Sequence, residues 1–122
     1  MTELRDILLR LHKTLLDSEC ASYERDVARI HSRHELLGLV LKDPWFAWLH
    51  ELSELVVLID EALDAKEPVA ADPERLMKQA RALLVPSEVG NGFAKRYYEA
   101  LQRDPDVVVA HGAAVKAMAS LS

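Results

Sequence analysis

Residues 43–64 read DPWFAWLHELSELVVLIDEALD, and this stretch decides the fold of the chain. Its start favours a helix, because the Asp43 carboxylate can accept from the free N–H groups of a first helical turn and Pro44 suits the first helical position, where no N–H is needed. On a helical wheel the apolar residues fill about half of the circumference, enough to pack against two or three neighbours. They are Trp48, Leu52, Leu55, Val56, Ile59, Ala62 and Leu63. We therefore predict a core helix over residues 43–64.

The opposite side of this helix is polar and mostly acidic. It carries His50, Ser53, Glu54, Asp60, Glu61 and Asp64. Phe46 projects toward this polar side on the wheel, while Trp48 points toward the core. An aromatic ring beside acids on a wet surface is typical of an interface anchor. Either Phe46 contacts a partner, or the preceding short helix or the N-terminal helix covers it.

Length and composition predict one globular domain, spanning residues 1–122. Half of the residues are apolar and the chain has only 4 Gly and 5 Pro, which excludes a disordered or low-complexity protein. No apolar run reaches the roughly 18 residues of a membrane-spanning helix, and the first ten residues carry charges where a signal peptide needs an apolar block. We expect a cytoplasmic protein that does not enter a membrane.

The net charge of −5 argues against nucleic acid and anionic membranes as partners. The acidic excess lies in the first half of the chain, since residues 1–66 hold 13 acids and 8 Lys or Arg while residues 67–122 hold 7 of each. Cys20 is the single cysteine, which excludes an intrachain disulfide and cysteine-based metal motifs. We interpret it as a buried, unreactive thiol.

Residues 3–31 form one long helix in our prediction, because apolar residues recur at spacings of three and four. The series runs Leu4, Leu8, Leu11, Leu15, then Leu16, Cys20, Tyr23, Val27 and Ile30. The one-residue shift between Leu15 and Leu16 predicts that the helix either rotates its contact face there or contacts a different neighbour beyond it. Ser32 and Glu35 then have the spacing of a capping box, which favours a new short helix over 36–42. The alternative is that the first helix continues to Lys42.

Prolines mark the boundaries between predicted elements in the second half of the chain. A linker is expected at residues 66–71 around Pro68, and Asp72-Pro73 opens a fourth helix that Pro86 ends. A loop with two glycines covers residues 86–92, a fifth helix spans 93–103, and Asp104-Pro105 opens a sixth. No segment alternates as a strand does, so we predict an all-α fold: a compact bundle of five or six helices with two long helices as its spine.

Metal and cofactor signatures are missing from the sequence. It contains no Glu-x-x-His, His-Glu-x-x-His or Cys-x-x-Cys-His, so no cofactor is predicted. His50 and Glu54 lie four residues apart and Glu61 lies near the same azimuth, which makes these three the weak metal candidates. Two other interpretations compete with metal binding: a solvated surface with local ion pairs, or a contact surface for a partner.

Two further histidines and one glycine-rich loop are candidate functional features. His12 borders the leucine stripe, where we expect a partly buried ring bonded to a neighbouring acid or, alternatively, an axial ligand. His111 stands beside Gly112 within a helix, and this glycine predicts the close approach of another helix; a small ligand over His111 is the alternative. The Gly90-Asn91-Gly92 loop lacks a phosphate-binding fingerprint.

The segment Asp-Pro-Trp-Phe-Ala-Trp-Leu at residues 43–49 carries a resemblance, together with Leu-His-Lys at 11–13, Tyr-Glu at 23–24 and Leu-Gln-Arg-Asp-Pro-Asp at 101–106. Taken together, these residues resemble a family of small uncharacterised bacterial all-helical proteins with no assigned function. The resemblance covers nearly the whole chain. It implies a helical fold and a cytoplasmic location, and it brings no activity, cofactor or catalytic residue.

The leading functional hypothesis is a non-catalytic helical protein-interaction module that self-associates, as a homodimer. Its interface residues are Phe46, His50, Glu54 and Glu61. The alternative is a metal- or small-ligand-binding helical bundle, in which His12, His50 or His111 faces a cavity together with carboxylates. An enzyme ranks third, because no motif names a reaction.

Overall fold

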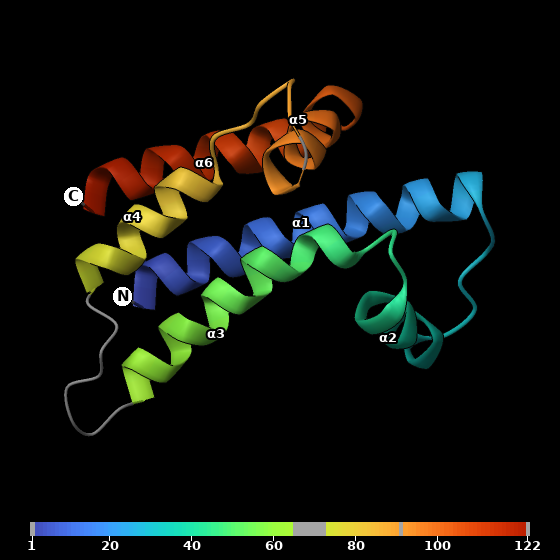
Figure 1. Cartoon of the computed structure of the whole chain (residues 1–122), viewed down its shortest axis with the longest axis horizontal. Coiled ribbons are helices and arrows are strands. Elements are labelled where there is room, and N and C mark those ends of the chain that lie inside the picture. Colours follow the sequence, from blue (N-terminus) through green and yellow to red (C-terminus); the bar gives the residue numbers. More distant parts are fainter. Residues whose placement is uncertain (1, 65–72, 91, 122) are drawn as a thin grey trace.

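The chain is an all-α bundle, as predicted. The computed structural model describes residues 2–64, 73–90 and 92–121, and in these ranges it contains helices and no strand (Figure 1). The elements are α1 (Thr2–Asp26), α2 (Arg33–Lys42), the short 3-10 helix η1 (Ala47–Leu49), α3 (His50–Asp64), α4 (Pro73–Leu83), α5 (Phe93–Arg103) and α6 (Pro105–Leu121). None of the helices in the described ranges combines the length and apolarity that a membrane crossing requires.

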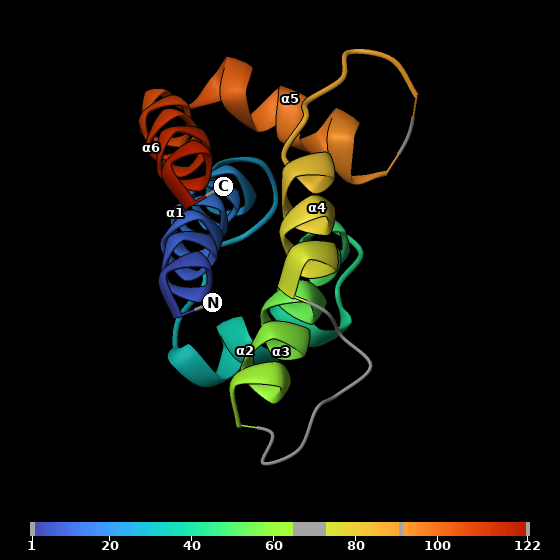
Figure 2. The ribbon, with the colours of Figure 1, turned by 90° about the vertical axis from the view of Figure 1, so that its left-hand side faces the viewer.

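Four helices surround one core. α1 packs against α3 and α6, and α4 closes the ring by packing against both α3 and α6, while α5 crosses one end of the bundle (Figure 2). α1 contributes a straight leucine stripe, Leu4, Leu8, Leu11 and Leu15, all fully buried. Leu52, Ile59 and Tyr97 meet it from α3 and α5. The predicted spine of two long helices corresponds to α1 with α3, and α6 is longer still than α3.

The end of α1 differs from the prediction. The helix ends at Asp26 rather than near residue 31. At this end the N–H groups of Val27 and Ala28 both donate to the Tyr23 carbonyl. The predicted rotation of the contact face at Leu16 is wrong, and the alternative, a different neighbour beyond Leu16, is correct, since Glu19 contacts Arg103 of α5 and Tyr23 contacts Phe46. The buried positions continue in the same line past Leu15, and they are Ser18, Glu19 and Ser22. Three polar residues are thus buried, which an apolar pattern could not predict, and the apolar Val27 is exposed.

The predicted break at Ser32 is confirmed. Ser32 Oγ accepts from the Glu35 N–H at 3.0 Å, and the Glu35 carboxylate accepts from the His31 N–H at 3.2 Å. The first bond satisfies a free N–H group in the first turn of α2, as in a capping box, and the second reaches the residue before the N-cap rather than the N-cap itself. α2 itself has no fully buried residue, so it is a peripheral helix at one end of the bundle (Figure 1).

The central helix begins later than predicted. Asp43 Oδ1 accepts from the Trp45 N–H at 2.8 Å, which closes an Asx turn, and η1 follows before α3 starts at His50. Residue 46 therefore does not lie on the helical wheel that placed it on the polar side. Phe46 is fully buried, and its ring centroid lies 5.6 Å from that of Tyr23 of α1. The placement of Phe46 on the wet surface was wrong, and the alternative in which the N-terminal helix covers it is correct.

The second half follows the sequence closely. α5 has the predicted bounds, α6 starts at Pro105, and Gly90 and Gly92 of the connecting loop have φ values of +94° and +82°, a region that favours glycine. α4 starts at Pro73 and ends at Leu83, before Pro86. The predicted linker at 66–71 and the capping role of Asp72 lie outside the described residues.

Candidate interaction groove

The outer side of α3 is acidic, as the sequence predicted, and Glu54 and Glu61 are exposed along it. Glu51, which lay outside the predicted strip, is exposed on the same side of the helix. Leu58 lies among these glutamates, with 42% of its surface exposed. The acidic surface is therefore interrupted by an open leucine.

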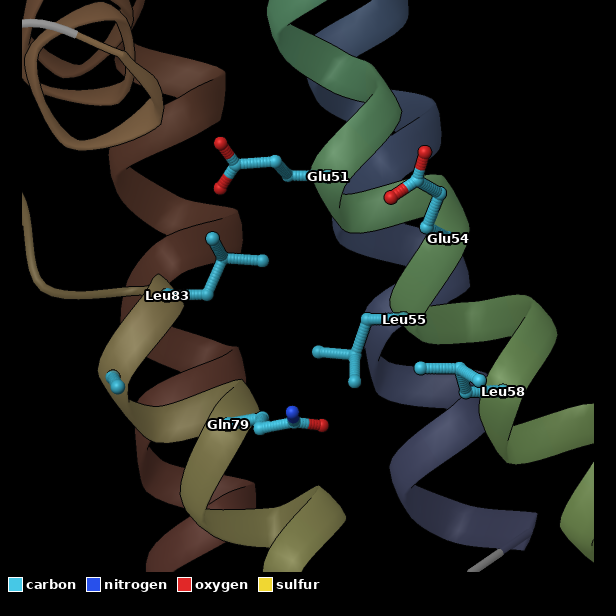
Figure 3. Close-up of a pocket in the computed structure, with 7 residues that line it drawn as sticks. Glu51, Glu54, Leu55, Leu58, Gln79 and Leu83 are labelled. Atoms are coloured by element: carbon cyan, nitrogen blue, oxygen red, sulfur yellow. The ribbon is translucent and has the colours of Figure 1, made fainter. Parts of the chain in front are cut away.

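A groove of about 460 Å³ runs between this surface and α4. Figure 3 shows Leu55 and Leu58 reaching from α3, and Gln79 from α4, into the space between the two helices, while Glu51 extends from α3 toward the side of Leu83 and Glu54 stays beside α3. Its lining residues are Glu51, Glu54, Leu55, Leu58, Gln79, Ala82 and Leu83. The groove thus has an apolar floor and acid on one wall.

The charges on α3 divide into paired and unpaired groups. Asp60 is bound by Arg5 of α1, whose Nη1 lies 3.1 Å from Asp60 Oδ1. Glu51 and Glu54 take part in no ion pair within ranges 2–64, 73–90 and 92–121. The groove wall therefore carries two carboxylates that no cation of the described residues neutralises, and a cationic group on a bound molecule would meet both of them.

The other predicted site residues do not gather there. His50 Nε2 lies 2.8 Å from the Val40 carbonyl oxygen, which ties its ring to α2 rather than to Glu54. Glu61 is exposed beyond the groove lining, and Phe46 lies in the core. Over the described part of the chain, no three His, Cys, Asp or Glu side chains come together as a metal-binding group, and so His50, Glu54 and Glu61 do not form one.

His12 has a different partner from the one expected. Its Nε2 lies 2.8 Å from Ser53 Oγ, and the Ser53 hydroxyl donates to the Leu49 carbonyl at 3.2 Å. Because the hydroxyl has a single proton, His12 Nε2–H is the donor to Ser53. Burial lowers the pKa of His12 from its ordinary value, which favours the neutral ring with its proton on Nε2.

His111 belongs to a buried hydrogen bond between α5 and α6. Its Nδ1 lies 2.6 Å from the hydroxyl of Tyr97, a fully buried residue. Burial raises the pKa of Tyr97 and lowers that of His111, so a neutral phenol donates to a neutral imidazole. The predicted close approach of a helix at Gly112 is wrong, since a Cβ added there would meet nothing within 4 Å.

An ion pair that no sequence pattern predicted joins α1 and α5. Glu19 is 1% exposed, and its Oε1 accepts from Arg103 Nη2 at 2.9 Å, while the same nitrogen lies 3.2 Å from Ser18 Oγ. The available signal was weak: Ser18, Glu19 and Ser22 continue the spacing of the leucine stripe, but their polarity argued for the surface.

A second cavity, of about 490 Å³, adjoins this ion pair. Two atoms of its lining residues, Glu19 Oε2 and Trp45 Nε1, are buried and make no hydrogen bond with any described residue. Arg25 and Arg96 stand at its edge.

Cys20 of α1 is half-buried. Burial, followed by the charge of Asp17, raises the pKa of its thiol, as an unreactive thiol requires.

Comparison of the chain with protein-family models, with curated proteins and with solved structures finds no match. The resemblance drawn from residues 43–49 therefore stays a prediction.

Proposed function

We propose that this chain is a non-catalytic protein-interaction module whose groove between α3 and α4 binds an amphipathic helix of a partner protein. The observation that supports the proposal is the groove itself, in which Leu58 lies open beside Glu51 and Glu54. Two helices that leave an apolar groove between them present the shape that a third helix fills, with its apolar side chains at spacings of three and four.

The charge of the groove defines the partner. Leucine or similar side chains of the partner helix would cover Leu55 and Leu58, and Lys or Arg on the same helix would lie against Glu51 and Glu54. Apolar burial supplies most of the affinity, at about 25 cal/mol per Å² of covered surface. The carboxylates act mainly on specificity and association rate, because each exposed ion pair contributes only about 0–1 kcal/mol.

A pair of designed peptides tests the proposal. One is a ~18-residue amphipathic Leu/Lys helix, and the other has the same leucines with Glu in place of Lys. Titration of the protein, followed by NMR, is expected to shift amide signals of residues 51–58 and 79–83 with the Leu/Lys peptide and to leave them unchanged with the Leu/Glu peptide. Equal binding of the two peptides, or shifts elsewhere only, would refute the proposal.

Variants sharpen this test. Leu58→Glu is expected to weaken Leu/Lys peptide binding more than about tenfold, or 1.4 kcal/mol, because it removes apolar contact and places a charge on the groove floor. Val57→Glu is the matched control, since Val57 is also an exposed apolar residue of α3 and does not line the groove. Glu54→Lys is expected to reduce the preference for the cationic peptide.

The second cavity supports a runner-up function, the binding of a small polar ligand. Glu19 Oε2 needs a donor and Trp45 Nε1 needs an acceptor, and a free amino acid carries both groups. Fluorescence of a Trp48→Phe variant, which retains Trp45 as its one indole, is expected to change on titration with amino acids at millimolar concentration. An unchanged spectrum would remove this candidate.

A further inference from the structure

We propose that a cavity between the C-terminal end of α4 and α6 is a second binding site, which takes a small apolar carboxylic acid in its ionised form. α4 packs against α6 in the bundle (Figure 1). The cavity between them has a volume of about 450 Å³. Pockets for small ligands span roughly 300–1,000 Å³. The site is separate from the α3–α4 groove, because the two have no lining residue in common.

Most of the lining of this cavity is apolar. Leu84 and Met118 are each only 3% exposed, whereas Val85 and Val115 are 62% and 45% exposed. The apolar lining thus extends from the core to the surface, so a molecule that enters from solvent can bury its apolar part. The apolar lining residues are Leu84, Val85, Pro86, Val115, Met118 and Ala119.

His111 supplies a hydrogen-bond donor at a fixed position. Its Nδ1 accepts from the Tyr97 hydroxyl at 2.6 Å, and the two rings meet edge to face with their centroids 5.3 Å apart. A neutral imidazole that accepts at Nδ1 carries its proton on Nε2. His111 lines the cavity, and Nε2–H is the remaining polar group of its ring. The bond from Tyr97 therefore makes His111 a donor toward a ligand rather than an acceptor.

Arg81 supplies a positive charge. Its Nη2 lies 3.4 Å from the Met118 carbonyl oxygen, which places the guanidinium against α6 at the cavity. Arg81 takes part in none of the ion pairs between described residues. A guanidinium has five N–H groups, so this one long bond to Met118 leaves donors for a ligand.

The cavity also differs from its neighbours in having no acid. Four other cavities, of about 460 to 530 Å³, each have at least one carboxylate among their described lining residues, including one that Arg81 also borders. The lining between α4 and α6 has one cation, one further N–H donor and no carboxylate. These two groups favour an anion, and the apolar walls disfavour a strongly hydrated one such as phosphate. A carboxylate on an apolar body meets both conditions.

Octanoate is the probe for this site. Titration of the full chain, followed by NMR, is expected to shift amide signals of residues 81–85 and 111–119. Hexanoate is expected to bind more weakly, by up to about fourfold for each CH₂ that it lacks. Octylammonium has the same tail with the opposite charge, and it is expected to bind at these residues at least about tenfold more weakly. No shift with octanoate at millimolar concentration, or equal binding of octylammonium there, would overturn the proposal.

Two arginines of α4 provide a matched pair of variants. Arg81→Met keeps a long side chain and removes the charge, so it is expected to weaken octanoate binding at least about tenfold and to change octan-1-ol binding less than about twofold. Arg75→Met is the control, because Arg75 is also exposed on α4 and does not line the cavity. Circular dichroism of each variant excludes unfolding as the cause. Equal weakening of octanoate binding by both variants would refute the role of Arg81.

Nitrogen NMR of the His111 ring tests the second donor. The parent protein is expected to have its ring proton on Nε2, and octanoate is expected to shift this signal. A ring proton on Nδ1, or an Nε2 signal that octanoate leaves unchanged, would refute the role of His111. Leu58→Glu, in the α3–α4 groove, is expected to leave octanoate binding unchanged, so this proposal and the proposed function fail independently.

Discussion

At the scale of single residues, the buried Glu19 carboxylate is the costliest group in the core. A carboxylate that is 1% exposed has lost its hydration, and Arg103 is the cation that compensates for it across α1 and α5. The pair costs desolvation energy on both sides, so its net contribution to stability is small. Removing one partner destabilises the fold strongly, because the other charge then stays buried alone.

This difference gives a prediction for Arg103→Ala. The variant is expected to lose about 3 kcal/mol of unfolding free energy, the lower end of the range for broken buried pairs, because Arg103 itself is partly exposed. Urea denaturation at pH 7 measures the loss. The double variant Glu19→Met with Arg103→Met is expected to recover most of it, since no unpaired charge remains. A double variant as unstable as Arg103→Ala would contradict this explanation.

The two buried histidines predict a pH dependence. Burial lowers the pKa of His12 and of His111 below 6.5, the value expected in the unfolded chain. Below about pH 6.5 the unfolded chain therefore binds more protons than the folded one, and linkage makes stability fall as the pH falls. We expect a lower urea midpoint at pH 5.5 than at pH 7.5.

Substitution identifies the source of this pH effect. Protonation of His111 at Nδ1 removes the acceptor for the Tyr97 hydroxyl, and protonation of His12 adds a charge beside Ser53. A variant with both histidines replaced by glutamine is expected to have a smaller difference between the two pH values. An unchanged difference would assign the effect to carboxylates instead.

At the scale of the elements, α2 is held by its cap more than by its contacts. It has no fully buried residue, and the Ser32–Glu35 bond is a local interaction. Elements with few buried contacts open locally without global unfolding. Ser32→Ala is therefore expected to cost about 1 kcal/mol locally, which raises hydrogen-exchange rates of α2 amides about fivefold. Exchange in α1 and α3 should be unchanged; an equal increase there would show that α2 unfolds only with the whole bundle.

At the scale of the whole molecule, two open surfaces lie on helices that are diagonal in the bundle. The α3–α4 groove is acidic, whereas α6 has two charged residues apart from its histidine, so the two helices present different surfaces. We expect peptide binding in the groove to be independent of changes on α6, with no coupling free energy. Peptide titrations of the parent and Gly112→Arg proteins should give affinities within about twofold. A larger difference would show that the bundle couples the two surfaces.

The groove also shows how far the sequence predicts a site. The acidic strip of α3 follows from helical periodicity alone, and Glu54 of this strip lines the groove. The opposite wall comes from α4, whose Gln79 and Leu83 are far along the chain from Glu54. No local pattern states which helix lies beside which, so the groove itself was beyond the reach of the sequence.

The helical class, the capped start of α2 and the bounds of α5 follow from local sequence, because they depend on interactions between residues a few positions apart. The burial of Phe46, the pairing of buried Glu19 with Arg103 and the open surroundings of Gly112 follow only from the packing of the helices. Distance along the chain explains the difference. Tyr23 and Arg103 fix the surroundings of Phe46 and Glu19 from other helices, and the free energy of those contacts appears only when the helices pack together.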